Sequence, residues 1–301
     1  MRTGPILLYV IGIAVFCVMD AVMKTLVQNN PAVMATFWRY VSAILFTGLF
    51  WLQAGRPRIT REMLPVHLLR GSILAVSATL FFWSLSVLSL TQAVTIAFSA
   101  PLLIPPIAAL MLKERMQAGS VMAGIIGFAG VLVAVGFEPE DWQGERLRGV
   151  AAALGSAVTY AVSTVLMRLR AARDGPAVLS LLGAIIPAGV LGPVMLLTIP
   201  SAQWLPQGVD WLWVAAAGAS GVVALQFIAR AYARAEAQVL APFEYTALGW
   251  AALLGWVFFD EPVLARTWAG ALIVAGACLW QARKASADRA ATVETPSNPA
   301  A

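Results

Sequence analysis

The chain alternates between long apolar runs and short polar breaks. Ten apolar runs can be read along it, each close to the roughly 20 residues that a helix needs to cross a bilayer. They cover approximately residues 5–25, 32–54, 66–88, 91–112, 118–137, 148–168, 178–199, 211–233, 238–259 and 264–282. The pattern therefore predicts an all-α polytopic membrane protein with ten transmembrane helices.

One stretch of the chain, residues 89–133, is repeated at residues 235–279. Each copy is an apolar run, a short charged link and a second apolar run, and a repeat of this size decides the architecture. Matching residues stand at the same separation in both copies: Gln92 with Gln238, Leu102 with Leu248, Ala123-Gly124 with Ala269-Gly270, and Ala129-Gly130 with Ala275-Gly276.

Each copy lies in a half of five spans, and five is odd, so the second half must enter the membrane upside down. Inverted repeats of this kind commonly place a substrate site near mid-membrane between the halves. We therefore expect two inverted five-helix repeats around a central cavity. The expected units are a first half at 1–137, an extracytoplasmic linker at 138–147, a second half at 148–283 and a polar, disordered cytoplasmic tail at 284–301.

Composition supports a membrane protein. The chain is 60% hydrophobic and 12% charged, whereas soluble domains are about 45–50% apolar and about 25% charged. The net charge of +5 does not indicate a nucleic-acid partner, because the basic residues stand in the breaks between apolar runs. With the N-terminus in the cytoplasm, fifteen of the 20 Lys and Arg residues fall on the inner side. This bias predicts that both termini are cytoplasmic, in a bacterial-type inner membrane, with the lipid bilayer as a partner.

Three stretches resemble the EamA-type halves of the drug/metabolite transporter superfamily. In residues 19–43, Lys24 closes the first span, Pro31 lies in the link, and Arg39-Tyr40 lies in the second span. Residues 113–133 and 260–279 are both similar to the link between the fourth and fifth spans of such halves. The resemblance covers nearly the whole chain, and within the superfamily the chain is most similar to amino-acid exporters of the YddG type. It departs at Met19-Asp20, where the family often has Trp-Gly, and at Gly183, near where a second copy of Arg39 would fall.

The resemblance implies a secondary transporter that exports small metabolites by alternating access. Amino acids with broad specificity are the implied cargo, headed by threonine, methionine and the aromatic amino acids. The sequence leaves three alternatives open: efflux of cationic drugs or dyes, antiport of nucleotide sugars or sugar phosphates, and a membrane scaffold or enzyme that transports nothing. A channel is also compatible with the pattern, although proline-broken spans in an inverted repeat favour alternating access.

Three ionisable residues stand in the first two spans. Asp20 and Lys24 are one helical turn apart and can pair, and Asp20 and Arg39 have similar depths, so that pair is also allowed. The structural interpretation is an ion pair that closes the outer end, since pairing is how such charges are tolerated. The functional interpretation makes Arg39 an anion-recognising group or Asp20 a coupling-ion site.

Glu244 enters the ninth span two residues after Pro242. Arg230 has a compatible depth for a structural ion pair. The alternative is a protonatable carboxylate beside a backbone freed by proline, which binds a substrate ammonium group or a proton.

Polar and aromatic residues recur within the spans of both halves. They either join helices through hydrogen bonds or line the expected cavity, where aromatic faces attract cations and cover apolar surface. The candidate substrate-binding residues are Asp20, Arg39, Thr79, Phe82, Trp83, Thr95, Ser99, Thr159, Tyr160, Ser163, Gln226, Glu244 and Tyr245. Prolines remove backbone donors and allow a helix to bend, and the candidate hinges are Pro101, Pro105 and Pro242.

Motifs for other chemistries are missing from the sequence. There is no HExxH pair, no Ser/His/Asp set and no Walker loop, and the single histidine, His67, lies near the inner interface. We therefore expect no enzyme activity, no cofactor, no metal site and no use of ATP. Small residues four apart favour close helix packing, either within a monomer, the expected state, or between copies.

Overall fold

The computed structural model describes residues 3–113, 118–136, 143–168, 171–235, 240 and 243–294. This part of the chain is helical and contains no strand. The helices are α1 (Thr3–Asn29), α2 (Ala32–Gln53), α3 (Leu64–Leu85), α4 (Leu90–Ala97), α5 (Ala100–Leu112), α6 (Ala118–Val135), α7 (Gly144–Arg168), α8 (Ala171–Thr198), η2 (Ser201–Gln203), α9 (Asp210–Tyr232), α11 (Thr246–Phe259) and α12 (Ala265–Glu294).

Ten spans fit these helices, as the apolar pattern predicts. Seven helical segments are long and apolar enough to cross a membrane, and two shorter apolar helices lie at Val121–Val135 and Thr246–Phe259. The fourth span consists of α4 and α5, which are separated by a break at Phe98 and Ser99. Pro101, one of the candidate hinges, stands in the first turn after this break.

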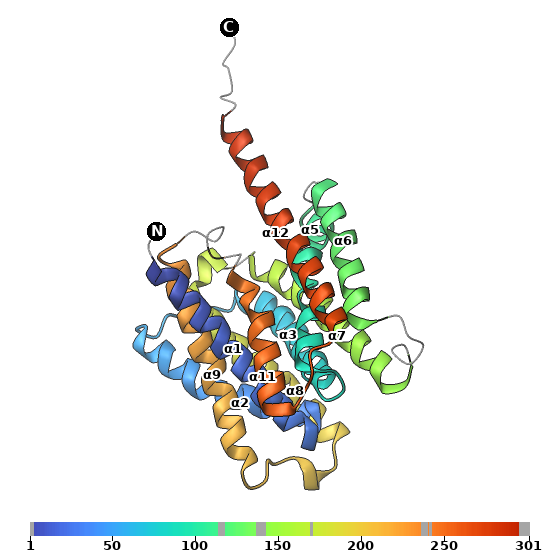
Figure 1. Cartoon of the computed structure of the whole chain (residues 1–301). Coiled ribbons are helices and arrows are strands. Elements are labelled where there is room, and N and C mark those ends of the chain that lie inside the picture. Colours follow the sequence, from blue (N-terminus) through green and yellow to red (C-terminus); the bar gives the residue numbers. More distant parts are fainter. Residues whose placement is uncertain are drawn as a thin grey trace.

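The way in which the helices pair reflects the repeat. α1 packs against α9, and its counterpart α7 packs against α3, the counterpart of α9. α2 packs against its own counterpart α8, and α6 against its counterpart α12 (Figure 1). Exchanging the two halves reproduces this set of contacts, which is the property of a structure with an internal two-fold relation. Both halves also end their fourth helix in a left-handed residue, Lys113 (φ 55°) and Asp260 (φ 52°).

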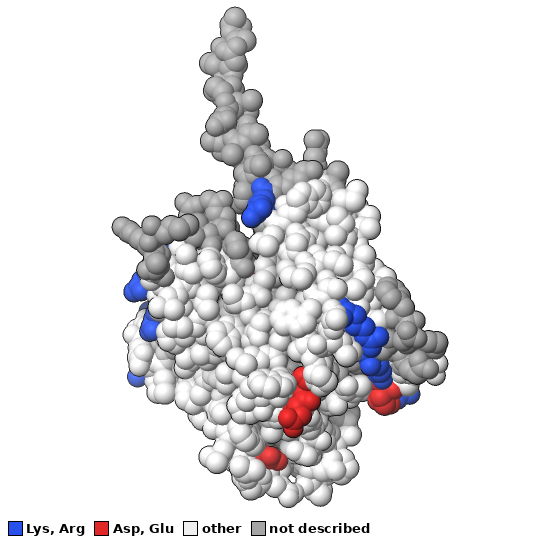
Figure 2. Space-filling view, in the orientation of Figure 1, with Lys and Arg blue, Asp and Glu red and all other residues white. Residues whose placement is uncertain are grey.

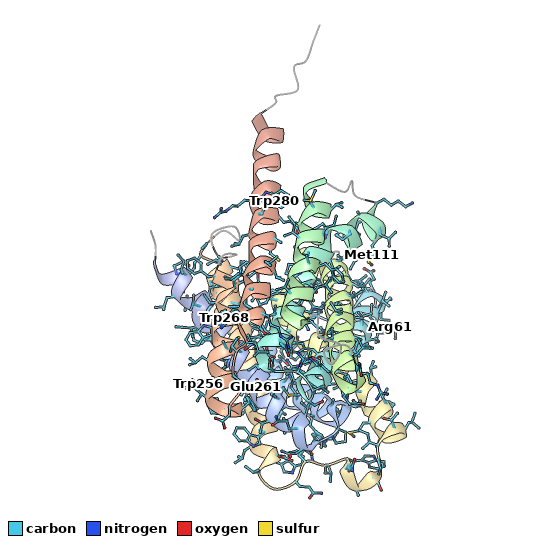
Figure 3. All side chains as sticks on the ribbon, turned by 45° about the vertical axis from the view of Figure 1, so that its right-hand side comes forward. Arg61, Met111, Trp256, Glu261, Trp268 and Trp280 are labelled. Atoms are coloured by element: carbon cyan, nitrogen blue, oxygen red, sulfur yellow. The ribbon has the colours of Figure 1, made fainter. Side chains whose placement is uncertain are left out.

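We name the two ends of the helix bundle by residues that lie there. The Glu261 end holds the end of α1, the start of α4, and the link between α11 and α12. The His67 end holds the starts of α1 and α3 and the end of α12, and it faces upwards in Figure 1. Figure 3 shows α12 running from near Glu261 at the lower side to Trp280 at the upper side.

The outer surface between the two ends is apolar. Leu45, Leu110, Leu197, Leu212 and Leu272 each have more than two thirds of their side chains exposed. The face in Figure 2 has a broad band without Lys, Arg, Asp or Glu, and acidic residues gather towards its lower end. Such a surface is expected of helices that are solvated by lipid.

α6 and α12 approach most closely at one pair of glycines. A Cβ atom on Gly270 would collide with the carbonyl oxygen of Gly130 and lie 2.5 Å from the backbone nitrogen of Ala134. The equivalent positions in the repeat, Gly124 and Gly276, have nothing within 4 Å of such an atom. The backbones therefore meet at Gly130 and Gly270, whereas Gly124 and Gly276 have room for a side chain. Between these positions, a Cβ atom on Gly127 of α6 would lie 3.6 Å from Ala277 of α12.

The second half extends beyond its expected bounds of 148–283. α7 begins at Gly144, where Glu145 in the first turn favours a helix N-terminus. α12 continues to Glu294, eleven residues beyond the expected end of the second half at 283. Four of these eleven residues are Ala, and the segment also contains one Lys, one Arg and one Glu, which are all strong helix formers.

Candidate functional site

Glu244 lies where the ninth span is interrupted. Tyr245, the next residue, forms a turn before α11 begins at Thr246. Among the described residues Glu244 forms no ion pair, and the expected partner Arg230 is exposed at the end of α9. The carboxylate acts electrostatically on three tyrosines that come from three other helices: Tyr9 of α1, Tyr160 of α7 and Tyr232 of α9.

These tyrosines are close to one another. The hydroxyl oxygens of Tyr9 and Tyr232 are 3.3 Å apart, and their rings meet edge to face at a centroid distance of 5.5 Å. Tyr9 is buried, whereas Tyr160 is 51% exposed and Tyr232 is 45% exposed. Because Tyr160 is exposed and still interacts with groups on several other elements, we infer that it faces a solvent-accessible space between them.

Arg70 of α3 also acts electrostatically on Tyr160. Its Nη2 atom is 3.6 Å from the sulfur of Met167, and its Nε has no hydrogen-bond partner among the described residues. The guanidinium faces Gly183 of α8, where a Cβ atom would lie 3.8 Å from Nη1. Tyr160 is thus an electrostatic neighbour of a carboxylate of the second half and of a guanidinium of the first half. Neither charged group has an ion-pair partner in the described part of the chain.

The helix breaks in the fourth and ninth spans lie at equivalent positions of the sequence repeat. The separation of Gln92 and Gln238 equates Phe98 with Glu244 and Ser99 with Tyr245. The rings of Phe98 and Tyr245 pack against each other at 5.3 Å, so the two breaks meet between the halves. Ser99 is buried, and its hydroxyl has no partner among the described residues. Helices broken at corresponding positions are a feature of substrate sites in transporters with inverted repeats.

The Glu261 end is closed by a buried ion pair that joins the halves. The Nζ atom of Lys24 is 2.6 Å from Glu261 Oε1 and donates a hydrogen bond to the carbonyl oxygen of Leu88 at 2.6 Å. The other carboxylate oxygen of Glu261 accepts a hydrogen bond from the backbone nitrogen of Leu90, the first residue of α4, at 2.8 Å. The expected local pair of Lys24 with Asp20 is therefore wrong, because Lys24 is occupied by Glu261.

Asp20 and Arg39 are electrostatic neighbours but not an ion pair. Asp20 is 5% exposed, and its Oδ1 has no hydrogen-bond partner among the described residues. Arg39 instead lies 3.1 Å from the sulfur of Met19 through its Nε atom. Its guanidinium lies over the rings of Tyr40 and Phe82, at 4.8 and 5.2 Å. The allowed Asp20–Arg39 pair is thus absent in this conformation.

A second polar contact between the halves lies at the opposite end. His67 Nε2 of α3 is 2.8 Å from Asp174 Oδ2, and both side chains are 1% exposed. Asp174 precedes Gly175, whose φ of 74° interrupts α8 and requires a glycine. His67 stands out in the sequence as the single histidine, but its partner could not be predicted because it is far away in the chain and lies in a polar break.

Most of the other predicted candidate residues are buried or half-buried and take part in packing. Ser77 donates a hydrogen bond to the carbonyl oxygen of Ser156, which joins α3 to α7, and Ser163 is buried. Three threonines donate to carbonyl oxygens of their own helices: Thr79, Thr95 and Thr159. Phe82 is buried, and Trp83, Gln226 and Tyr245 are half-buried. Pro105 lies inside α5, and Pro242 is outside the described residues.

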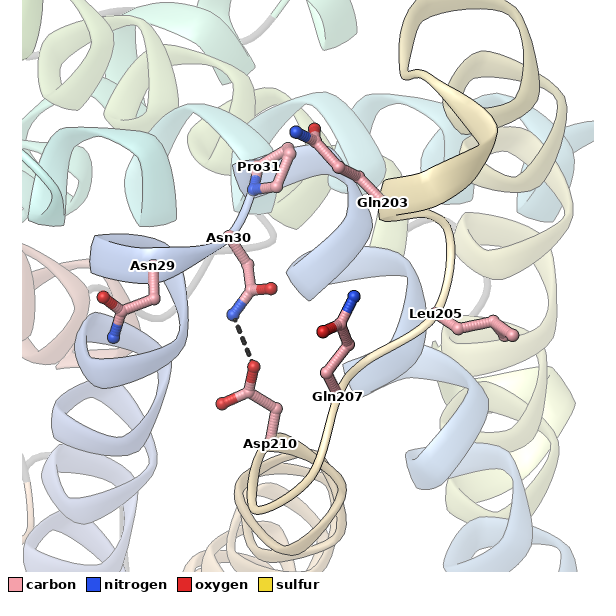
Figure 4. A pocket seen from close by; sticks show the side chains of 7 residues that line it. All are labelled: Asn29, Asn30, Pro31, Gln203, Leu205, Gln207 and Asp210. Carbon is pink, nitrogen blue, oxygen red and sulfur yellow. Dashed lines mark hydrogen bonds between the residues drawn. The ribbon is translucent and has the colours of Figure 1, made fainter.

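A small polar pocket lies at the Glu261 end (Figure 4). It has a volume of about 240 Å³ and is formed by the link after α1 and the segment before α9. Asn30 donates a hydrogen bond across it to Asp210 Oδ2 at 2.9 Å. Its lining residues are Asn29, Asn30, Pro31, Gln203, Leu205, Gln207 and Asp210. This pocket is at the surface end of the bundle, away from the meeting point of the two helix breaks.

The sequence matches one family model in both halves. The model of the EamA-like transporter family covers residues 3–136 and again residues 147–281. A solved structure titled "Crystal structure of protein" has a TM-score of 0.62 and covers 98% of this chain and 100% of its own, at 19% identity. That likeness concerns the fold.

Several curated relatives are similar over most of their length. The riboflavin transporter of Brucella anthropi is 24% identical, over 85% of this chain and 89% of its own. The S-adenosylmethionine uptake transporter of Rickettsia felis is 25% identical, over 87% and 86%. The pseudopaline exporter CntI of Pseudomonas aeruginosa is 26% identical, over 91% and 94%. All three are named as transporters of small molecules.

Proposed function

Because this chain belongs to the EamA-like transporter family, we propose that it is a secondary transporter that exports amino acids and related zwitterionic metabolites. It is a multi-pass membrane protein, and its similar relatives carry small molecules. Their names include both uptake and export, so the direction proposed here is supported by other features of the chain.

The proposed cargo rests on the charges around Tyr160. A zwitterion has an ammonium group and a carboxylate, and Glu244 and Arg70 offer one partner for each. A guanidinium binds carboxylate in a planar geometry, and bonds between charged partners are stronger than neutral ones. Tyr160 and Tyr232 provide aromatic surface for the rest of the molecule. Tyrosine rings accept many side-chain shapes, which supports broad specificity.

The named cargoes of the relatives are compatible with such a site. S-adenosylmethionine contains an amino-acid group and a further positive charge, and riboflavin contains a fused aromatic ring system. Carriers similar to this chain thus accommodate both an amino-acid group and an aromatic surface. Amino acids with aromatic, methionine or threonine side chains combine these features in smaller molecules.

The proposed direction rests on the two ends of the bundle. We place the His67 end in the cytoplasm, because the basic breaks of the sequence belong to this end. Tyr160 and Tyr232 are exposed, and Lys24 and Glu261 close the opposite end. This conformation would load cargo from the cytoplasm, as an exporter requires. A subsequent rocking of the halves would release it outside.

Counterflow of labelled amino acids into proteoliposomes tests the proposed function. We expect threonine, methionine and phenylalanine to exchange faster than in empty vesicles. Glu244→Gln and Arg70→Gln should each lower the exchange at least tenfold, because about 1.4 kcal/mol of lost substrate stabilisation corresponds to a factor of 10. Each variant removes the partner of one charge of the zwitterion.

Two exposed residues at the same end provide matched controls. Glu62→Gln and Arg61→Gln make the same charge changes at exposed positions (Arg61 is labelled in Figure 3) and should leave exchange unchanged. Absence of amino-acid exchange by the wild type would contradict the proposal. Efflux of cationic dyes that depends on Glu244 but not on Arg70 would instead identify a drug exporter.

A further inference from the structure

Asp20 is a buried carboxyl group whose environment does not suit a negative charge. It is 5% exposed in the middle of α1, and its Oδ1 has no hydrogen-bond partner among the described residues. An ionised carboxylate can accept about four hydrogen bonds and is very unfavourable in an apolar environment without them. The site therefore fits the neutral acid in this conformation.

The surroundings of Asp20 come from several helices and contain one nearby cation. α2 contributes Arg39, whose charge acts on Asp20, and α3 contributes Phe82 beneath the guanidinium. α9 contributes Gly221, where a Cβ atom would lie 3.5 Å from Arg39 Nη2. On α1 itself, the thiol of Cys17 lies one turn before Asp20 and is directed to the carbonyl oxygen of Ala247 in α11.

The remaining charges in this region are occupied. Lys24, one turn after Asp20, is held by Glu261 and by the carbonyl oxygen of Leu88. Arg39 is the group that can compensate a negative charge on Asp20, and its guanidinium now lies on the rings of Tyr40 and Phe82. The positive charge that could stabilise an ionised Asp20 is thus nearby, but the guanidinium of Arg39 is directed to the two aromatic rings and not to the carboxyl group.

We propose that Asp20 is the ion-coupling site of this transporter and that the ion is a proton. In the conformation described here, Asp20 holds the proton and Arg39 lies on Phe82. When Arg39 turns to Asp20, the O–H bond of the acid breaks, the proton passes to water, and the carboxylate pairs with the guanidinium. Because Arg39 and Phe82 come from α2 and α3, which contact α8 and α7 of the other half, this change is linked to the movement of the halves.

The neighbouring groups favour a proton over a metal cation. Sodium and other hard cations require several oxygen ligands. The groups shown to interact with Asp20 are the guanidinium of Arg39 and the thiol of Cys17, and neither offers an oxygen ligand. The positive charge of Arg39 would also repel a bound metal cation, whereas a proton on Asp20 only neutralises the carboxylate.

The first test measures proton movement, and it rests on the proposed transport of amino acids. Proteoliposomes that contain a pH-sensitive dye receive an outward gradient of threonine, methionine or phenylalanine. We expect the wild type to move protons against the amino-acid flow. Asp20→Asn should lose proton movement at least tenfold, also when it is compared with whatever counterflow the variant retains, and Asp20→Glu should retain both proton movement and counterflow. Proton movement that persists in Asp20→Asn, or that is absent in a wild type that transports, would overturn the proposal.

The second test does not depend on transport or on the folding of the asparagine variant. Infrared spectroscopy of the wild type should show the carbonyl band of a protonated carboxylic acid near neutral pH. This band should shift in Asp20→Glu, because the acid has a longer side chain in the same environment. A wild-type spectrum without a band that responds to this substitution would overturn the proposal. If the wild type carries no amino acid at all, the proposed cargo fails while this measurement still decides the state of Asp20.

Discussion

Replacing Glu261 with Gln is expected to lower the free energy of unfolding by about 3 kcal/mol, because Lys24 would remain as a buried charge without a counter-charge. Lys24 is 3% exposed, and its remaining partners would be the carbonyl oxygen of Leu88 and the ring of Phe259, neither of which carries a negative charge. The glutamine can still accept a hydrogen bond from the start of α4. The measured loss of stability therefore reports the charge of the ion pair and not the loss of this hydrogen bond. Thermal or denaturant unfolding in detergent micelles measures the difference.

Two further variants make this prediction specific. Asp260→Asn changes the neighbouring exposed carboxylate, and asparagine tolerates its left-handed backbone (φ 52°), so stability should change by less than about 0.5 kcal/mol. The double variant Lys24→Met with Glu261→Gln should be more stable than Glu261→Gln alone, because it removes the isolated cation. Equal stabilities of Glu261→Gln and Asp260→Asn would contradict the role of the pair.

Replacing Gly270 with Ala is expected to destabilise the bundle by about 1–3 kcal/mol, and Gly270→Leu should prevent folding. The added atom collides with backbone groups of α6, the carbonyl of Gly130 and the nitrogen of Ala134, which cannot rotate away. Close approach of backbones at small residues is a major source of helix association in membranes. The same unfolding measurement in detergent detects the loss.

Gly276 and Gly124 are matched controls on the same two helices. Neither has an atom within 4 Å of an added Cβ, and alanine is preferred over glycine within a helix by about 1 kcal/mol. Gly276→Ala and Gly124→Ala should therefore leave stability unchanged or raise it slightly. A loss in these variants as large as that of Gly270→Ala would mean that helix geometry in general, rather than the Gly130–Gly270 crossing, limits stability.

The helices and the repeat could be predicted from the sequence because lipid imposes simple requirements. Every span must be long and apolar, and an odd number of spans in each half fixes the inverted relation. The break of the fourth span was also predictable, since Pro101 and Pro105 stand close together. The exact ends of the helices could not be predicted. α12 continues to Glu294, because good helix formers extend a helix into water after the apolar run has ended.

The partners of the charged residues could not be predicted in the same way. Spacing along a helix suggested Lys24 with Asp20, whereas the fold brings Glu261 and Leu88 to Lys24 from distant parts of the chain. Arg70 is one of the basic residues that fall on the inner side, so the sequence assigns it a role in orientation and not in a site. Its position six residues inside α3 was the available signal that it belongs to the interior.

The open and tight glycine positions along α6 and α12 imply a mechanical property of the molecule. The repeat equates Gly130 with Gly276 and Gly270 with Gly124, so the observed contact has a mirror contact that is not made here. If each half takes up the shape of the other in the opposite state, the point of closest contact between α6 and α12 moves along these helices from Gly130 and Gly270 to Gly124 and Gly276. In a variant with alanine at Cys17 and Cys278, a cysteine pair at positions 124 and 276 should cross-link only in the state that is open at the Glu261 end. The interface of α6 and α12 would then have two alternative glycine contacts, one in each state. The sequence repeat makes these two contacts equivalent.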